Sequence, residues 1–366
     1  MKTQIIALFY LCLVVLAGCG PADDHAAGTE KSGGDNAGTN NVLRLVEEKS
    51  FDLTEIGGGE LYGVRSFDID AAGNMLLYDR KVKQIFKCSP SGELLVKIGK
   101  RGHGPGEYEI VSSIHVGDNG EISICDPINR KFVYYGPDGA LLREQKFTIR
   151  VVDGVRLKNG NYLFKKLEVS ESSVFNHVVF LTDGEFNTIK ELHRQATFNP
   201  QGAKLKGILY NFSCPVAGER IYIADQETGY EINVFDLSGN HLHTITKSFT
   251  PVAPTEAYKE FFMSTIPPRV KEFVKAKLYF PEHLPPFHDI VTAGQGRLMV
   301  ITYEQSQKEN HFFVDIFDKH GTFAGRQVLH LPILSTEFRI LGKKNHLYIV
   351  SPEADDSIRL KVLKIL

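Results

Sequence analysis

Short apolar runs alternate with turn residues along the chain from about residue 42 to the C-terminus. Six runs have the same character: "NMLLYD" (74–79), "EISICD" (121–126), "NYLFKK" (161–166), "RIYIAD" (220–225), "RLMVIT" (297–302) and "HLYIVS" (346–351). Each follows a turn signal, such as Asn119-Gly120 or Asn159-Gly160. Asn-Gly favours a type I′ turn with positive φ at both central residues, so each run is predicted to be the second strand of a hairpin.

A further strand follows each of these runs, and five of those strands lead to another turn glycine. These glycines are Gly92, Gly139, Gly184, Gly239 and Gly321. Four strands in about 45 residues, repeated, are typical of a β-propeller blade. Six such units predict an all-β fold, a six-bladed β-propeller. Two β-sandwich domains are the alternative, and the single period along the whole chain argues against them.

The two ends of this pattern and one long interval need separate explanations. The sixth blade ends at "KVLKIL" without a fourth strand, and "VLRLVEE" (42–48) has no hairpin partner of its own. We expect 42–48 to close the ring, because an open blade would expose an unpaired edge.

Segment 252–286, between blades 4 and 5, has helical spacing at Val270, Phe273 and Val274, with Thr255 as a cap. It is predicted to be a small helical insertion.

The N-terminus has the pattern of an export signal. Lys2 precedes an apolar stretch from Ile5 to Leu16, and "LAGC" ends at Cys19. This pattern predicts a lipoprotein signal peptide over 1–18 and a lipid on Cys19; an ordinary secretory signal is the alternative. Residues 19–41 lack large apolar side chains and are predicted to be a disordered tether before the propeller at 42–366. We therefore expect a lipid-anchored protein of the cell envelope. The expected place is the outer membrane, facing the periplasm or the cell surface.

The stretch "GKRGHGPGEY" (99–108) is rich in glycine and carries a histidine and basic residues. A phosphate-binding loop would need the spacing G-x-x-x-x-G-K-[ST] between a strand and a helix, which this stretch lacks. It begins where the last strand of the first blade ends. The interpretation is therefore a connector from blade 1 to blade 2, in which glycines permit sharp bends.

Three motifs together resemble a known family. "IGKRGHGPGEY" (98–108), the lipobox and "YFPEHLPPFHDI" (279–290) look like the six-bladed β-propeller lipoproteins of Gram-negative gut-type bacteria, which have NHL-like and TolB-like blades. The similarity covers 42–366. It implies the fold and a place in the cell envelope, but members of the family mostly lack an assigned activity.

Composition narrows the classes of partner. The formal net charge is -2 and 23 % of residues are charged, so no basic excess points to nucleic acid. Cys88, Cys125 and Cys214 are widely spaced and form no C-x-x-C pair, which argues against a disulfide framework or a zinc site. No G-x-S-x-G elbow is present.

Polar residues near the starts of the inner strands are the candidate ligand contacts. In a propeller these starts meet at one end of the central channel, here named the connector rim. The candidates are Arg65, His103, His115, Asn211, His288 and Asp289. The resemblance also implies a relation to propeller enzymes that hold a metal in the channel. Among them, lactonases bind calcium through carboxylates and amides, and amidating lyases bind zinc through three histidines. Parts of both sets are present, with Glu337 as a further carboxylate, but neither set is complete. No catalytic residue, metal or other cofactor is therefore assigned, and zinc or calcium remains the alternative.

Asp79, Asp126 and Asp225 recur at the ends of the second strands. Repeated acids can indicate calcium sites, but aspartate also bonds backbone N–H groups in turns, and we prefer this structural interpretation.

The function expected from the sequence is binding rather than catalysis. We expect an interaction module for a protein, peptide or glycan, with its site at the connector rim beside 252–286. The opposite rim, formed by tight hairpins, is expected to leave little room for a pocket. The alternative is a metal-dependent hydrolase or lyase acting in the channel, and segment 252–286 could also be a lid that only seals it.

Overall fold

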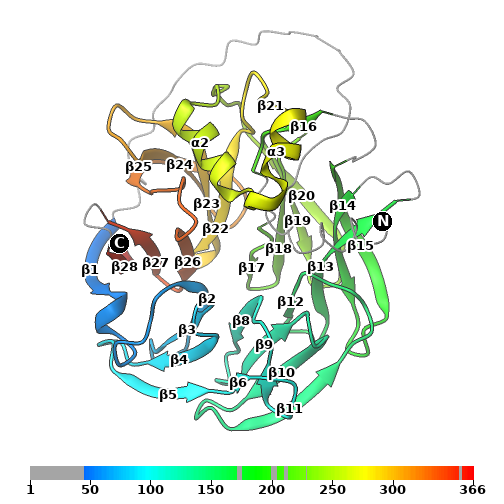
Figure 1. The fold of residues 1–366 in the computed structure, drawn as a ribbon, viewed down its shortest axis with the longest axis vertical. Coiled ribbons are helices and arrows are strands. Elements are labelled where there is room, and N and C mark those ends of the chain that lie inside the picture. Colours follow the sequence, from blue (N-terminus) through cyan, green and yellow to red (C-terminus); the bar gives the residue numbers. More distant parts are fainter. Residues whose placement is uncertain (1–44, 171–174, 199–203, 210–212, 228, 354–356) are drawn as a thin grey trace.

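Six four-stranded sheets surround a central axis in the computed structural model of the chain (Figure 1). The structure describes residues 45–170, 175–198, 204–209, 213–227, 229–353 and 357–366. Each sheet is an antiparallel meander in which the first strand lies nearest the axis. The predicted all-β, six-bladed propeller is confirmed.

The blades follow one another along the chain. Blade 1 contains β2 (Val64–Ile69), β3 (Met75–Asp79), β4 (Gln84–Cys88) and β5 (Leu94–Ile98). Blade 2 contains β8 (Ser113–Val116), β9 (Ile122–Asp126), β10 (Lys131–Tyr135) and β11 (Leu141–Lys146). Blade 3 contains β12 (Asp153–Arg156), β13 (Tyr162–Val169), β14 (Phe175–Thr182) and β15 (Thr188–Phe198). Blade 4 contains β17 (Val216–Ala217), β18 (Arg220–Asp225), β19 (Glu231–Asp236) and β20 (His241–Thr246). Blade 5 contains β22 (Phe287–Ala293), β23 (Arg297–Gln305), β24 (His311–Phe317) and β25 (Phe323–His330).

Blade 6 joins the two ends of the described chain. Its strands are β26 (Arg339–Lys343), β27 (His346–Pro352), β28 (Ile358–Ile365) and β1 (Leu45–Asp52). β1 pairs antiparallel with β28, from Leu45 opposite Ile365 to Asp52 opposite Arg359. Closure of the ring by the N-terminal strand is thus confirmed. The strand extends beyond the expected segment to Asp52, while residues 42–44 lie outside the described part of the chain.

The hairpin turns differ from the predicted type I′ geometry. In the turn of blade 2, the Gly120 N–H bonds the Gly117 carbonyl oxygen at 2.9 Å, and the Gly117 N–H bonds the Glu121 carbonyl oxygen at 2.9 Å. Gly120 has a φ of 80°, whereas Asn119 is not among the residues with positive φ. This pattern is a type I turn followed by one left-handed residue, so the type I′ prediction is wrong for this turn.

The prediction that Gly184 takes the left-handed position of a turn is also wrong. In blade 3 the left-handed position belongs to Phe186, with a φ of 65°, rather than to Gly184. The ring of Phe186 packs against Tyr162, with ring centroids 4.8 Å apart, and against Phe147 at 5.5 Å. These aromatic contacts offset the backbone strain that a residue other than glycine carries at positive φ.

Two helices occupy the predicted insertion between blades 4 and 5. The helices are α2 (Glu256–Thr265) and α3 (Pro268–Lys277). Thr255 caps α2 as predicted, since its hydroxyl accepts the Tyr258 N–H at 3.2 Å. α3 ends at Lys277, and Leu278 belongs to the short strand β21 (Leu278–Tyr279), which pairs with β16 (Leu205–Lys206). Among the described residues, no helix has the length and apolarity to span a membrane.

The hydrophobic core lies mainly between neighbouring blades. Between blades 1 and 2, for example, Leu76 and Ile85 pack with Ile124 and Val133. A separate cluster joins the insertion to blade 3, where Phe262 and Val274 pack with Leu167 and Phe175. Complete burial of one such side chain contributes about 1.5–3 kcal/mol. The helices are therefore fixed on the propeller at the face where blade-to-blade connectors reach the inner strands.

Candidate ligand site in the channel and at the connector rim

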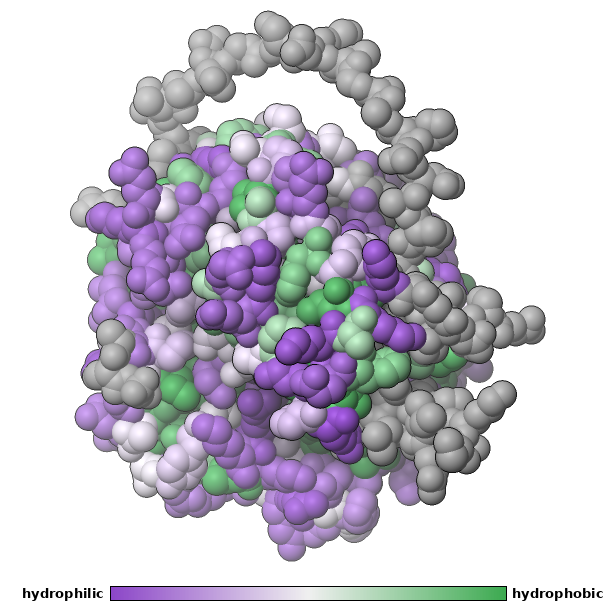
Figure 2. All heavy atoms as spheres, turned by 45° about the horizontal axis from the view of Figure 1, so that its top comes forward, coloured by the Kyte–Doolittle hydropathy of each residue, from purple (hydrophilic) through white to green (hydrophobic). Residues whose placement is uncertain are grey.

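The inner strands β2, β8, β12, β17, β22 and β26 line the central channel (Figure 1). Their first residues form the connector rim, and the turns that lead to the second strands form the opposite end, here named the hairpin rim. α2 and α3 lie on the connector-rim face. A space-filling view with the top of Figure 1 turned forward shows apolar patches among hydrophilic residues (Figure 2).

The glycine-rich stretch is a connector, as predicted. It runs between β5 and β8, and β6 (Lys100–Arg101) pairs with β7 (Glu107–Tyr108) inside it. His103 is exposed on this connector, and its Nδ1 lies 2.7 Å from Oδ1 of Asn129. His103 is therefore bonded to the turn after β9 rather than to the residues that line the channel.

Two of the three recurring aspartates have the structural role that was predicted. Asp79 is buried and accepts the Lys81 N–H at 2.7 Å and the Gly63 N–H at 2.7 Å. Asp126 is buried and accepts the N–H groups of Asn129 at 3.1 Å and Glu109 at 2.8 Å. Each carboxylate thus ties the turn after a second strand to the segment that precedes the inner strand. The side chain of Asp225 lies outside the described part.

Arg65 lies at a β-bulge near the start of β2. The register between β2 and β3 shifts between Val64 and Ser66, and the Arg65 side chain is exposed at the connector rim. A bulge can redirect a side chain toward a site. Surrounding protein atoms keep part of the water away from the Arg65 guanidinium and so lower its pKa, and the positive charge of Arg80 lowers this pKa further.

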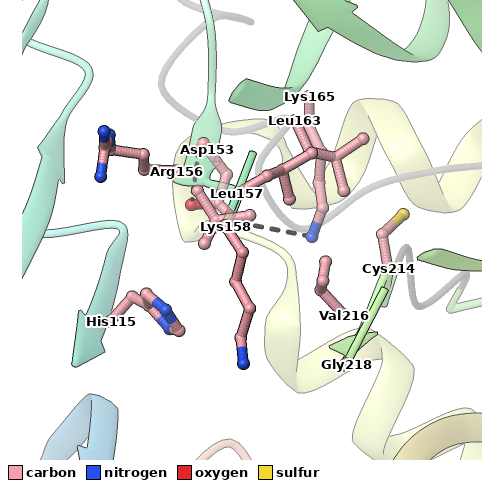
Figure 3. Close-up of a pocket in the computed structure, with 12 residues that line it drawn as sticks. His115, Asp153, Arg156, Leu157, Lys158, Leu163, Lys165, Cys214, Val216 and Gly218 are labelled. Carbon is pink, nitrogen blue, oxygen red and sulfur yellow. Dashed lines mark hydrogen bonds and ion pairs between the residues drawn. The ribbon is translucent and has the colours of Figure 1, made fainter. Parts of the chain in front are cut away.

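Lys165, Asp153 and Cys214 lie on the other side of the channel from Arg65. The Lys165 amine is 3.4 Å from Oδ2 of Asp153, and in the close-up it lies between Asp153 and the Cys214 thiol (Figure 3). Burial lowers the pKa of Lys165, but the charges of Asp153 and Asp289 raise it, and the net shift is upward. Burial raises the pKa of the Cys214 thiol, which Lys165 only partly counteracts. At neutral pH the amine is charged and the thiol is protonated.

His288 occupies a second bulge, near the start of β22. The register shifts between Phe287 and Asp289, as it does around Arg65 in blade 1. The imidazole ring packs edge-on against Tyr303 at 5.6 Å and Phe338 at 6.4 Å. Burial lowers the pKa of His288 to about 4, and among the described residues its Nδ1 has no hydrogen-bond partner. His288 is therefore neutral at pH 7.

His115 lies deeper in the channel than the rim expected for it. Its Nδ1 is 3.5 Å from Oδ2 of Asp68, which also binds the Lys343 amine at 2.8 Å through Oδ1. Asp68 further accepts the Val116 N–H at 2.7 Å, so this buried carboxylate links blades 1, 2 and 6. Burial lowers the pKa of His115, although Asp68 partly counteracts this effect.

Two hollows form neighbouring parts of the channel. A cavity of about 240 Å³ is lined by Asp153, Lys165 and Cys214, and a larger one of about 540 Å³ opens among the hairpin-rim turns, including Asp118 and Lys344. The two share six lining residues: His115, Arg156, Leu157, Lys158, Val216 and Gly218. The expectation that the hairpin rim leaves little room is wrong, because its turns stand around the channel mouth instead of closing it.

The structure brings together only part of the predicted set. Arg65, His288 and Asp289 lie at the connector rim, whereas His103 and His115 lie elsewhere, and Asn211 and Cys19 are outside the described residues. Within the described ranges, no three His, Cys, Asp or Glu side chains are placed to share a metal ion. The sequence analysis missed Asp153, Lys165, Arg80 and Arg339. The signal for Asp153 and Arg339 was their position at the start of an inner strand.

Comparisons with known proteins agree with the class that the fold defines, a six-bladed propeller with an open axial channel. Residues 68–212 match the model of the family DUF5128, described as a 6-bladed beta-propeller. No curated protein matches the chain significantly.

Two solved structures show the same architecture at low identity. A protein of Bacteroides fragilis described as exported aligns with a TM-score of 0.56 and 16 % identity, over 89 % of this chain and 95 % of that one. A DUF4221 family member from Bacteroides vulgatus aligns with a TM-score of 0.51 and 12 % identity, over 88 % of this chain and 98 % of that one. These similarities support the propeller part of the family resemblance, and the lipoprotein part stays a prediction.

Proposed function

We propose that the chain is a lipid-anchored propeller of the cell envelope that binds a protein, peptide or glycan at its connector rim. The pattern around Cys19 supports the anchor, and the description of the Bacteroides fragilis structure as an exported protein agrees with a place outside the cytoplasm. Lys165 of blade 3 pairs with Asp153 and interacts with Asp289 of blade 5, and Lys165 and Asp153 line the 240 Å³ cavity, which supports this place for the binding site.

The protonation states at the rim carry the preference for binding over catalysis. A lysine needs a lowered pKa to act as a base or nucleophile, and a cysteine needs a thiolate. Lys165 and Cys214 have pKa shifts in the opposite direction, so both are protonated at neutral pH. These groups are suited to hydrogen bonds and ion pairs with a ligand.

Glycan and peptide arrays test the place of binding. We expect the purified protein to bind members of one array, and Asp289→Lys to weaken that binding about tenfold or more because it reverses a charge at the rim. Asp118→Lys is the matched control, since it makes the same charge change at an exposed residue of the hairpin rim. If Asp118→Lys abolished binding and Asp289→Lys did not, the proposed position of the site would be wrong.

Metal analysis of the tag-free protein tests the binding function against a metal enzyme. We expect less than one zinc or calcium ion per chain. A full equivalent of either metal, removed by Asp289→Asn together with a hydrolase or lyase activity, would overturn the proposal.

A further inference from the structure

Three arginines from the two blades at the ring closure lie together at the connector rim. Arg65 comes from β2, Arg80 follows β3, and Arg339 begins β26. The Arg339 Nε–H donates to the carbonyl oxygen of Arg65 at 3.2 Å, and an Nη2 atom of Arg80 lies 3.5 Å from Oε1 of Glu337. The cluster thus spans the seam between blades 6 and 1.

The guanidinium of Arg65 is the group without a partner. Among the described residues, this guanidinium makes no hydrogen bond or ion pair, and the Arg65 side chain is exposed at the rim. Arg339 differs, because its Nη1 donates to the carbonyl oxygens of Thr336 at 2.9 Å and Phe338 at 2.5 Å. Arg65 is therefore free to bind a group from outside the chain.

The charges in this cluster are unbalanced. Three guanidinium groups face one carboxylate, Glu337, and Asp153 acts on Arg65 only from across the channel. Burial and the charge of Arg65 lower the pKa of Arg339 to about 10. Both effects mean that positive charge is held here at a free-energy cost, which a bound anion would offset.

We propose that Arg65, together with Arg80 and Arg339, binds a carboxylate group of the ligand. This inference rests on the proposed binding function and specifies the chemistry of one contact. A guanidinium presents two parallel N–H donors that match the two oxygens of a carboxylate. The cluster is confined to one seam, which suits a single acid group; a long polyanion would need a stripe of basic residues.

Matched pairs of probes test this contact and identify the source of the carboxylate. One arm uses uronic acid oligosaccharides and their methyl esters, and the other uses peptides with free and amidated C-termini. The full-length protein should bind the free acids of one arm about tenfold or more tightly than their neutralised copies, because a charged hydrogen-bonded pair is lost on neutralisation. Higher salt should weaken the same binding.

Arg65→Gln should remove the preference for the free acid. Its melting temperature should equal or exceed that of the wild type, since the substitution relieves repulsion with Arg80, so the loss cannot be ascribed to unfolding. Arg194→Gln, on the outer strand β15, is the control and should leave the preference unchanged. The inference fails if no free acid binds, or if Arg65→Gln or neutralisation has no effect. Binding that depends on Asp289 but not on Arg65 would disprove this inference and leave the proposed function standing.

Discussion

Single positions in the hairpins show how strongly backbone geometry limits the sequence. Gly160 adopts a φ of 90° in the turn of blade 3, and a Cβ atom placed there would meet no other atom within 4 Å. Any cost of a side chain at this position must therefore come from the left-handed backbone rather than from a clash. The same cannot be said of Gly92, where a Cβ would lie 2.6 Å from Ile56.

Gly160→Ala should lower the free energy of unfolding by about 1–2 kcal/mol, the usual cost of a left-handed conformation for an L-residue. Gly160→Asn should cost less, because asparagine tolerates this conformation better than alanine. Urea unfolding of the two variants and the wild type measures both values. Equal stability of all three proteins would contradict the assigned turn geometry.

His288 gives the stability a dependence on pH. Its pKa is lowered to about 4 in the folded protein, whereas an unfolded chain has a histidine pKa of about 6.5. Between these values the unfolded state binds more protons, so stability falls as the pH falls from 6.5 toward 4. For this one group the loss between pH 7 and pH 5 amounts to about 2 kcal/mol.

His288→Phe keeps an aromatic ring against Tyr303 and Phe338 but cannot take up a proton. Its free energy of unfolding should therefore change by about 2 kcal/mol less than that of the wild type between pH 7 and pH 5. His177, which burial also gives a pKa of about 4, is present in both proteins and cancels in the comparison. Identical pH dependence of the two proteins would rule out the lowered pKa of His288.

At the scale of elements, local patterns in the sequence predicted far more than contacts between distant segments. The apolar runs and turn glycines located the blades, and Thr255 marked the start of α2. The bulges at Arg65 and His288 left no local signal, because they depend on how each inner strand meets its neighbour. The pairing of Arg65 with Arg339 was likewise invisible, since the two residues are 274 positions apart and meet only when the ring is closed.

The closing strand permits a direct test. Deletion of 45–52 would remove β1 and expose the edge of β28, so we expect a lower melting temperature and aggregation in size-exclusion chromatography. Deletion of 20–40, in the predicted tether, is the control and should leave both properties nearly unchanged. Equal behaviour of the two variants would show that the pairing of β1 contributes little.

At the scale of the whole molecule, the predicted anchor determines where the protein acts. Cys19→Ala should move it from the membrane fraction to the soluble fraction when cells are broken and centrifuged, because the lipid attachment atom is lost. The melting temperature of the purified propeller should not change, since Cys19 precedes the closing strand by more than twenty residues. Continued sedimentation with the membranes would exclude lipidation of Cys19 as the anchor.

Closure of the ring by β1 also has a kinetic consequence. Glu48 and His346 pair across blade 6 although 298 residues separate them in the chain. Contacts of such long sequence separation form slowly, because the loop between them must be ordered first. The first segment of the propeller to leave the ribosome is thus among the last to find its partner, and until then β28 offers a free edge to other chains. We infer that refolding slows at the closing step and that aggregation competes with it there.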